Sequence, residues 1–359
     1  MKIFPFFAQK LLEWYQISQR NLPWRGINDP YKIWVSEIIL QQTQVKQGLE
    51  YYNRFIARFP DVKSLAEADE QAVLLHWQGL GYYSRARNLH FAAKTILQEH
   101  NGVFPNEYQA VRNLKGIGEY TAAAITSFAW NMPYPVVDGN VFRFLARLFA
   151  VDEPVDTGRG KKLFTQLAGE LMDKPHAGQF NQAMIEFGAL QCTPTTPDCS
   201  ICPFAGHCLA LAQNAVANYP VKQNKTQTKN LYFYYFHIIE GIAGQAHTYL
   251  KKRTEKGIWQ NLFEFPLIES ETPLNFDELS QTESFQSWFP QNAQFKLIID
   301  TKKHVLSHRV IYATFYTVTS RRGVLHTPIP PNFIKIPSNE IDQYPVHRLM
   351  QYYLESQTS

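Results

Sequence analysis

Residues 192–208 read CTPTTPDCSICPFAGHC and contain all four cysteines of the chain. Cys192, Cys199, Cys202 and Cys208 follow the spacing C-x6-C-x2-C-x5-C, so four thiols are gathered in one short loop. A zinc site usually shows two short Cys or His pairs separated by a longer stretch. One C-x2-C pair flanked by a single cysteine on each side is more typical of a loop that wraps a [4Fe–4S] cluster. The spacing therefore favours a cluster over zinc, and over disulfides or unligated thiols.

The N-terminal sequence bears on the compartment in which these thiols exist. Residues 1–16, MKIFPFFAQKLLEWYQ, resemble an amphipathic helix and lack the apolar region and cleavage site of a secretory signal. No apolar run approaches the roughly 20 residues that a membrane span needs. Disulfides form in oxidising compartments, whereas a cluster needs a reducing one. We therefore expect a cytoplasmic protein.

Length and composition describe a globular chain with more than one domain. Its 359 residues exceed what one hydrophobic core organises, and 45% hydrophobic with 18% charged residues is ordinary for globular proteins. The net charge is +4, from 35 basic and 31 acidic residues. Binding to nucleic acid requires basic residues on one face rather than a large total. Charge alone therefore does not establish a nucleic-acid partner.

The chain changes character near residue 208. Before this point, apolar residues recur at helical spacing in segments separated by Gly and Pro. These segments are Tyr31–Gly48, Gln71–Leu80, Ser84–His100, Ala122–Trp130, Val141–Val151, Lys161–Met172 and Phe180–Leu190. Residues 209–230 are polar and are predicted to form a linker. Residues 231–355 contain β-branched and aromatic runs typical of strands, so we expect a mainly α domain over 1–208 and a smaller α+β domain.

The stretch LKGIGEYTAAAI, residues 114–125, places Gly116 and Gly118 between two helical segments. Two glycines at this spacing allow a tight turn whose backbone N–H groups can approach a phosphate. This predicts a helix–hairpin–helix over about residues 110–130, which would contact a DNA backbone without reading its sequence. A G-x-G pair is also common in ordinary turns, so the motif alone leaves both interpretations open.

Further motifs occur in a fixed order along the first domain. They are NLPWR (21–25), WVSEIILQQTQV (34–45), GLGYYSRARNL (79–89), GIGEYTA (116–122), VVDGNV (136–141), FNQAMIEFGA (180–189) and the four cysteines. In this order and spacing the chain resembles the endonuclease III superfamily, and within it the MutY-type adenine DNA glycosylases. The resemblance covers essentially all of residues 1–208 and implies a helix–hairpin–helix glycosylase domain with a [4Fe–4S] loop. The second domain resembles, more loosely, the family's MutT-like C-terminal domain.

The resemblance implies base excision repair, in which the N-glycosidic bond of adenine mispaired with 8-oxoguanine or guanine is hydrolysed. It makes Glu37 the general acid that protonates a ring nitrogen of adenine, because adenine is otherwise a poor leaving group. Apolar neighbours raise the pKa of such an acid and keep it protonated near neutral pH. Asp138 would stabilise the oxocarbenium ion, by analogy with retaining glycosidases. A surface glutamate and a helix N-cap are the alternative interpretations of these two residues.

Asn140 and Tyr120 complete the implied catalytic set. Asn140 would orient water or Asp138, and Tyr120 would lie beside the sugar; a turn residue and a core tyrosine are the alternatives. Family members that cut the strand carry lysine at the Tyr120 position, where it forms a Schiff base with the sugar. The tyrosine therefore predicts a monofunctional glycosylase. The competing interpretation is an endonuclease III-like glycosylase/lyase for oxidised pyrimidines.

The resemblance also assigns residues that hold the DNA. An enzyme must flip a base out of the duplex to reach it, and the segment with Leu80 and Tyr82 would supply the wedge. Gln42 and Thr43 would contact the opposite base. The positions expected to line the adenine pocket are Arg25 and Gln182, and the amide of the latter can pair with the base edge.

The second domain of the family senses 8-oxoguanine through a Phe-Ser-His loop. The segment here is Leu306-Ser307-His308, so the hydroxyl and imidazole are kept while the aromatic wedge becomes aliphatic. The implied partner is double-stranded DNA with A:8-oxoguanine or A:G mispairs, bound by a monomer at the bacterial nucleoid beside other repair proteins. The stretch NLFEFP (261–266) is followed by no Glu-rich metal box, which disfavours a nucleotide hydrolase. The two implied catalytic carboxylates disfavour a non-catalytic lesion binder.

Overall fold

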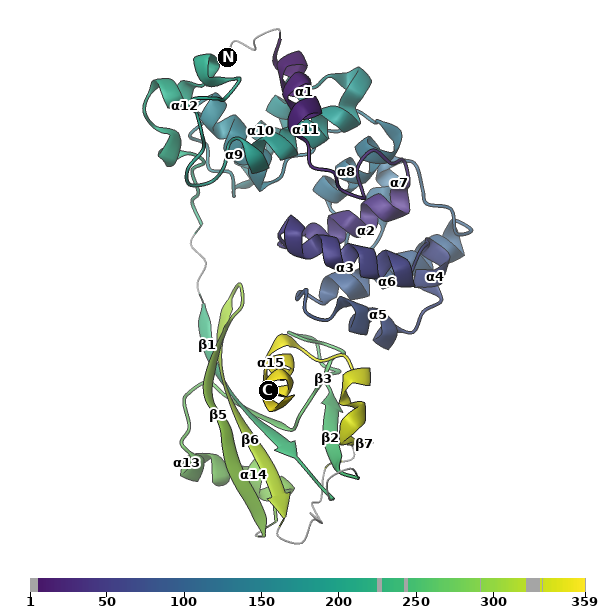
Figure 1. Cartoon of the computed structure of the whole chain (residues 1–359), viewed down its shortest axis with the longest axis vertical. Helices are drawn as coiled ribbons and strands as arrows, with labels where there is room; N and C mark the ends of the chain where they lie inside the picture. The colour runs from purple at the N-terminus through teal and green to yellow at the C-terminus, as the bar shows by residue number, and fades with distance from the viewer. Residues whose placement is uncertain are drawn as a thin grey trace. The chain divides into compact units, whose positions relative to one another are not determined.

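The computed structural model describes residues 6–224, 228–241, 245–290, 292–320, 330 and 332–358. The chain divides into two compact units (Figure 1). The first contains residues 1–67 and 88–224, and the second contains residues 68–87 and 225–359.

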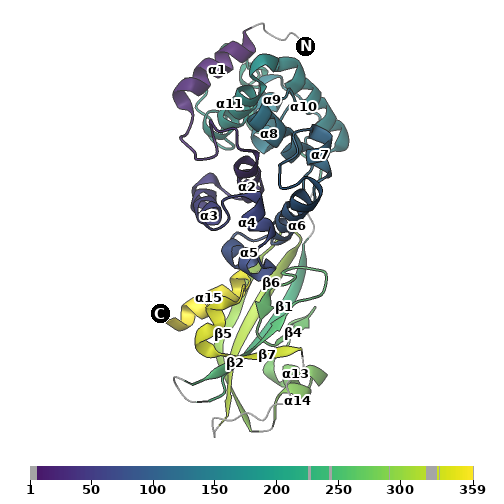
Figure 2. The same ribbon diagram turned by 90° about the vertical axis from the view of Figure 1, so that its right-hand side faces the viewer.

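Helices make up the first unit, which agrees with the predicted mainly α domain (Figures 1 and 2). They are α1 (Phe7–Ser18), α2 (Pro30–Leu40), α3 (Val45–Arg58), α4 (Val62–Ala66), α6 (Ser84–Glu99), α7 (Tyr108–Asn113), α8 (Glu119–Trp130), α9 (Gly139–Leu148), α10 (Gly158–Leu171), α11 (Ala177–Leu190) and α12 (Leu209–Ala212). The short 3-10 turns are η1 (Lys174–His176), η2 (Ala205–His207) and η3 (Val216–Asn218). The ends of α6 fall in different units, since the division lies between residues 87 and 88.

The segment Tyr31–Gly48, predicted as one helix, is broken into α2 and α3. Gln42, in the break, has a φ of 57°, which is outside the helical range. The apolar spacing continues across the break because both helices contribute buried residues to the segment, among them Trp34 of α2 and Gly48 of α3. Periodicity reports a buried face, and it does not report where the backbone turns.

Aspartates set the start of two helices that carry site residues. Asp29 accepts hydrogen bonds from the backbone N–H groups of Tyr31 and Lys32, and Pro30 fills the first position of α2. Asp138 does the same for α9, accepting from the N–H groups of Asn140 and Val141. Both are strong N-caps because each satisfies helix donors that lack an intrahelical partner.

An aromatic core lies beneath the cysteine loop. The ring of Phe187 lies 4.3 Å from that of Phe144 and 5.2 Å from that of Phe204. Phe7 of α1 packs 5.1 Å from Phe204. Residues 209–224, predicted to be a linker, contact this unit in part: the Val155 N–H donates to the Val221 carbonyl at 3.1 Å. The loop and the chain that follows it are thus fixed by the helical core.

The second unit contains two sheets, in agreement with the predicted α+β domain. The order of the first is β4-β1-β6-β5 and that of the second is β3-β2-β7. Their strands are β1 (Lys229–Ile238), β2 (His247–Lys252), β3 (Phe263–Glu264), β4 (Leu267–Ser270), β5 (Ala293–Val305), β6 (Arg309–Ser320) and β7 (Phe333–Pro337). The helices are α5 (Glu70–Trp77), α13 (Phe276–Ser280), α14 (Glu283–Trp288) and α15 (Arg348–Thr358), with the turn η4 (Ser338–Gln343). Strand β1 is parallel to β6 and antiparallel to β4.

Alternate residues of β1 face different helices, as the two-residue period of a strand requires. Phe236 packs 5.7 Å from Phe285 of α14, whereas His237 lies 5.5 Å from Tyr353 of α15. Helices therefore cover both faces of the four-stranded sheet.

Residues 68–87, predicted within the helical domain, make several contacts inside the second unit. The Tyr83 hydroxyl donates to the Val346 carbonyl at 3.1 Å, and the Val346 N–H donates to Gln78 Oε1 at 2.9 Å. Arg87 donates to the Gln260 carbonyl at 2.7 Å. The GLGYY segment is consequently held by the C-terminal domain through hydrogen bonds on both sides.

Candidate active site

A cavity of about 370 Å³ opens in the first unit and is lined by residues from α2, α8, α9 and α11. Eight of the predicted site residues line it: Arg25, Glu37, Gln42, Thr43, Tyr120, Asp138, Asn140 and Gln182. These side chains come from segments that are far apart in the sequence. The structure thus brings together both implied catalytic carboxylates and both residues of the implied adenine pocket.

Glu37 lies on α2 between buried neighbours, and burial raises its pKa to about 7. A hydrogen bond with Tyr120 opposes this rise, the negative charge of Asp138 adds to it, and the Arg25 cation opposes it. Burial also raises the pKa of the Tyr120 phenol, which keeps that phenol neutral. Glu37 can therefore carry a proton near neutral pH.

Asp138 faces the same cavity with both oxygens hydrogen-bonded. Its Oδ1 accepts from the backbone N–H groups of Asn140 at 2.9 Å and Val141 at 2.8 Å. Its Oδ2 accepts from Asn140 Nδ2 at 2.7 Å. Burial raises the pKa of Asp138, and these three hydrogen bonds oppose the rise because they favour the ionised form. The N-cap interpretation and a role at the cavity are therefore compatible.

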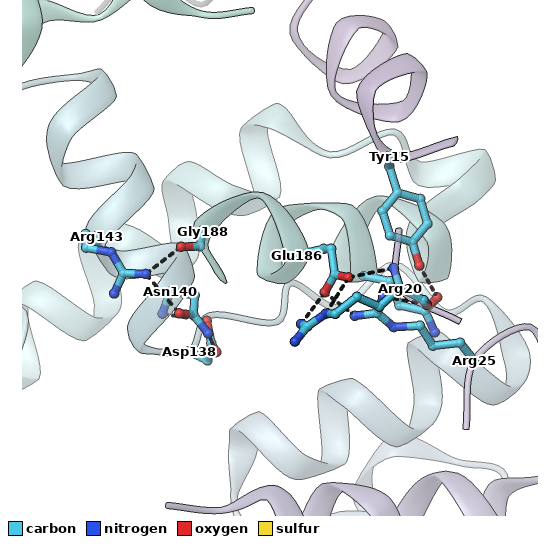
Figure 3. Close-up of polar contacts among 9 residues, drawn as sticks. Tyr15, Arg20, Arg25, Asp138, Asn140, Arg143, Glu186 and Gly188 are labelled. Carbon is cyan, nitrogen blue, oxygen red and sulfur yellow. Dashed lines mark hydrogen bonds and ion pairs between the residues drawn. The ribbon is translucent and has the colours of Figure 1, made fainter. Parts of the chain in front are cut away.

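Arg143 connects the Asp138–Asn140 pair to the cysteine loop, and its contacts with Asn140 and Gly188 are drawn in Figure 3. Its guanidinium donates to Asn140 Oδ1 at 2.9 Å, to the Gly188 carbonyl at 2.5 Å and to the Cys192 carbonyl at 2.8 Å. Gly188 permits this arrangement, because a Cβ there would lie 2.5 Å from the Asn140 carbonyl oxygen. The sequence analysis did not identify Arg143.

A second polar cluster borders the cavity around the buried carboxylate of Glu186 (Figure 3). Arg25 Nη2 donates to Glu186 Oε2 at 2.5 Å, and Arg20 donates to both carboxylate oxygens at 2.6 and 2.8 Å. The Tyr15 hydroxyl donates to Gln182 Oε1 at 3.1 Å. Sequence reasoning missed Tyr15, Arg20 and Glu186. An acid within an otherwise apolar helical run, IEFGAL, was the available signal for a buried Glu186.

The hairpin glycines have different structural roles. Gly116 has a φ of 81°, and a Cβ on it would lie 2.7 Å from the Cβ of Asn88, so glycine is required there. Gly118 is the N-cap of α8 in extended conformation, and no heavy atom lies within 4 Å of a Cβ built on it. Gly118 and Glu119 are exposed, so the chain at the start of α8 lies at the surface, where a phosphate can approach a helix N-terminus.

The predicted wedge and sensor residues lie in the second unit. Leu80 is buried, whereas Tyr82 is 49% exposed and has a φ of 47°. Leu306, Ser307 and His308 form the turn between β5 and β6, where the Leu306 N–H donates to the Arg309 carbonyl at 2.8 Å. The hydroxyls of Tyr82 and Ser307 lie 2.7 Å apart. Two segments assigned separately to DNA are therefore hydrogen-bonded to each other.

The four cysteines line one small cavity of about 30 Å³, together with Phe144, Phe187 and Phe204. Buried Arg147 donates to the Cys192 thiol at 3.5 Å and to the carbonyls of Thr193 and Pro194. In the part of the chain that the structure describes, no three His, Cys, Asp or Glu side chains converge closely enough for a single metal ion. Four thiols around a shared apolar cavity, beside a buried cation, are a donor set that as thiolates can ligate an anionic metal group.

Comparison with known proteins identifies the family to which this chain belongs. Residues 35–167 match the HhH-GPD superfamily base excision DNA repair proteins, and residues 235–356 match the NUDIX domain. The adenine DNA glycosylase of Buchnera aphidicola subsp. Baizongia pistaciae is 36% identical over 310 residues, which are 85% of this chain and 84% of that protein. The chain belongs to the adenine DNA glycosylase family. The human adenine DNA glycosylase is 41% identical over 214 residues, which are 57% of this chain and 39% of the human protein.

Solved structures extend the adenine DNA glycosylase comparison to the fold. A thermostable thymine-DNA glycosylase superposes with a TM-score of 0.54 and 25% identity, covering 58% of this chain and 95% of that one. Endonuclease III, trapped as a covalent intermediate with DNA, gives a TM-score of 0.51 at 18% identity and also covers 58% of this chain and 95% of that one. This shows a common fold. No helix within the described ranges has the length and apolar character that crossing a membrane requires.

Proposed function

We propose that this chain is a monofunctional adenine DNA glycosylase that hydrolyses the N-glycosidic bond of adenine paired with 8-oxoguanine or guanine. The observation that supports this most directly is the pair Glu37 and Asp138, which line one cavity with different hydrogen bonding. Burial raises the pKa of Glu37 to about 7, so that part of this carboxyl keeps its proton at neutral pH, and Asp138 accepts three hydrogen bonds that favour its ionised form. Two carboxyl groups in different environments match the requirement for an acid and an anion in glycoside hydrolysis.

The reaction would begin with the flipped adenine in the cavity. Glu37 donates its proton to N7 of the base, so that neutral adenine leaves as the C1′–N9 bond breaks. Positive charge develops on the sugar, and the Asp138 carboxylate stabilises it or bonds to C1′ for a short time. Water then replaces the base at C1′ and loses its proton to the Glu37 carboxylate. Asn140 holds Asp138 in place through its side-chain N–H.

Strand cleavage through a Schiff base requires an amine beside the sugar, and Tyr120 supplies a neutral phenol at this position. Tyr120 is hydrogen-bonded to Glu37, and its role would be to position this general acid. This favours hydrolysis alone over the alternative of an endonuclease III-like glycosylase/lyase for oxidised pyrimidines.

Gln42 and Thr43 line the cavity, and their amide and hydroxyl would contact the base opposite adenine. In the second unit, the segment with Leu80 and Tyr82 would supply the wedge that flips the base. The turn Leu306–His308 would sense 8-oxoguanine. We propose double-stranded DNA carrying such mispairs as the partner, bound by a monomer at the bacterial nucleoid.

A [4Fe–4S] cluster would be held by the thiolates of Cys192, Cys199, Cys202 and Cys208. Bound there, it would brace the loop that Arg143 joins to Asn140, and it would serve structure and DNA positioning. Glycosidic hydrolysis transfers no electrons, so the chemical steps belong to the side chains of the cavity. Analysis of purified protein should find roughly four iron atoms per chain.

The experiment is a single-turnover assay on duplexes with A opposite 8-oxoguanine, G or T, each read with and without alkali. Adenine release that gives strand breaks only after alkali, fastest opposite 8-oxoguanine, is the expected result. Glu37→Gln should retain mismatch binding and lose base release. Strand breaks without alkali would favour the lyase, and turnover by Glu37→Gln would refute the assigned acid.

A further inference from the structure

Tyr15 is buried on α1, with 2% of its surface exposed, and its hydroxyl reaches the cavity-lining amide of Gln182 on α11. The phenolic oxygen lies 3.1 Å from Gln182 Oε1. Since 167 positions separate the two residues, the contact exists only in the folded helical unit. Tyr15 lies outside every sequence motif that pointed to the site.

The surroundings of Tyr15 decide which atom of the Gln182 amide it holds. Burial raises the pKa of the phenol, so it keeps its proton and can donate it. The nearby carboxylate of Glu186 already accepts from the Arg20 backbone N–H, twice from the Arg20 guanidinium and once from Arg25. The phenol proton therefore goes to Gln182, and its acceptor there is the amide oxygen rather than the nitrogen.

This fixes the polarity that the amide presents to the cavity. Gln182 lines the cavity, and with Oε1 held by Tyr15 the orientation of its amide is fixed, so that Nε2 is the end of the amide that Tyr15 does not contact. Among the described residues, no acceptor is recorded for Nε2, so its N–H bonds are available to a bound base. The guanidinium of Arg25, also in the lining, offers further donors.

An amide of fixed orientation distinguishes purines by the edge that remains free. Glu37 occupies N7 in the proposed reaction, which leaves the Watson–Crick edge for Gln182. Adenine has the N1 acceptor beside the N6 donor, which match the N–H and the second lone pair of Oε1 in the amide; hypoxanthine has an N1–H donor beside the O6 acceptor, which match only the amide turned over. Leaving buried donors opposed or unpaired is costly, and sites use this cost to reject analogues.

We infer that Tyr15 is a positioning residue that locks the Gln182 amide with its N–H group toward the flipped base, so that the cavity selects adenine over 6-oxopurines. This inference rests on the proposed function, because it deepens the selectivity of that same site. Tyr15 contacts no substrate atom and acts through Gln182. In Tyr15→Phe the amide can turn over and present its oxygen, which pairs with an N1–H.

The test compares wild type, Tyr15→Phe, Gln182→Ala and the double variant as full-length proteins. Single-turnover rates are measured on duplexes with adenine or hypoxanthine opposite the same 8-oxoguanine. We expect Tyr15→Phe to lower adenine release by about 5- to 10-fold and hypoxanthine release by less, so that the ratio of rates narrows. The double variant should be no slower on adenine than Gln182→Ala, because both changes act through one amide.

Tyr31→Phe is the matched control, since it also removes a buried phenol hydroxyl, one that donates to the Phe59 carbonyl at 2.7 Å. It should lower thermal stability about as much as Tyr15→Phe and leave the adenine-to-hypoxanthine ratio unchanged. An unchanged ratio in Tyr15→Phe, or additive losses in the double variant, would overturn the inference. Failure of the wild type to release adenine would instead refute the proposed function.

Discussion

The phenolic oxygen of Tyr82 lies 2.7 Å from Oγ of Ser307, so the segment expected to enter the DNA is hydrogen-bonded to the turn expected to sense the lesion. Tyr82 has a positive φ, which is uncommon for an aromatic residue and is held by its neighbours. One of these, Tyr83, is anchored to the Val346 carbonyl. The two segments that are expected to read DNA are therefore joined by a hydrogen bond within the second unit.

Removing the hydroxyl of Tyr82 or that of Ser307 should weaken the same property, the preference for 8-oxoguanine over G as the opposite base. Tyr82→Phe and Ser307→Ala are each expected to reduce the preference for 8-oxoguanine over G by about 3- to 10-fold, and the double variant by no more than the larger single effect. The measurement is the ratio of single-turnover adenine release opposite the two bases. Tyr249→Phe, which removes a phenol hydroxyl that donates to Glu240 Oε2 at 2.7 Å elsewhere in the second unit, is the control and should keep the ratio. Independent, additive losses would mean that the two residues read the lesion separately.

The raised pKa of Glu37 makes activity depend on pH. If its proton is the one delivered to adenine, single-turnover rates should be constant below pH 7 and fall by about tenfold per unit well above it. The assay is a rate profile from pH 5.5 to 9 at fixed ionic strength. A profile that stays flat through pH 8.5 would exclude Glu37 as the titrating acid.

The same pKa has a consequence for stability. A carboxyl whose pKa is raised by folding stabilises the fold while protonated, and this contribution is lost as pH rises through about 7. Glu37→Gln, which stays neutral, should therefore gain thermal stability relative to wild type between pH 6 and pH 8.5. The test is to measure the thermal unfolding temperatures of wild type and Glu37→Gln at pH 6 and at pH 8.5. The same temperature difference between the two proteins at both pH values would contradict the prediction.

Much of this architecture follows from local sequence. Asp138 before an apolar helical run predicts the observed N-cap, and the glycine at 116 is required by its positive φ. What could not be predicted depends on the folded chain. The Arg20–Glu186 and Tyr15–Gln182 contacts join residues more than 160 positions apart, and no spacing rule connects them.

The break at Gln42 and the grouping of residues 68–87 were missed for a related reason. Apolar periodicity shows that a segment is buried, and it is the same whether the segment packs on one domain or another. Contacts made in the folded chain group residues 68–87 with the second unit, and hydrogen bonds such as that from Val346 to Gln78 involve ordinary residues with no sequence signature.

Tyr120 offers a gain-of-function test of the cavity geometry. Tyr120→Lys places an amine beside Glu37 and Asp138, where it can attack C1′ and form a Schiff base with the opened sugar. Borohydride should then trap a covalent protein–DNA adduct that wild type does not form. Tyr120→Phe, which has no amine, is the control and should give no adduct. Absence of an adduct from a folded, DNA-binding Tyr120→Lys protein would place this position too far from the sugar.

Glu186 should stabilise the cavity wall through its two arginines. Burial raises its pKa, but the hydrogen bonds from Arg20 and Arg25 prevail and lower it to about 2. A carboxyl with a depressed pKa stabilises the fold above its ordinary value of 4.5, and this contribution is lost only as pH falls toward 2. Its contribution should thus be constant from pH 6 to pH 8, unlike that of Glu37.

Glu186→Gln should consequently destabilise the protein by about 2–3 kcal/mol, a value reduced because solvent screens the partly exposed Arg20. The loss should be the same at pH 6 and pH 8, as measured by denaturant unfolding. Glu170→Gln, which changes an exposed acid of α10 bonded to Gln166, is the matched control and should shift stability by less than about 0.5 kcal/mol. Equal effects of the two substitutions would mean that the buried Glu186 cluster contributes no more to stability than a surface pair. Other residues of the cavity lining would then have to hold Arg25 in place.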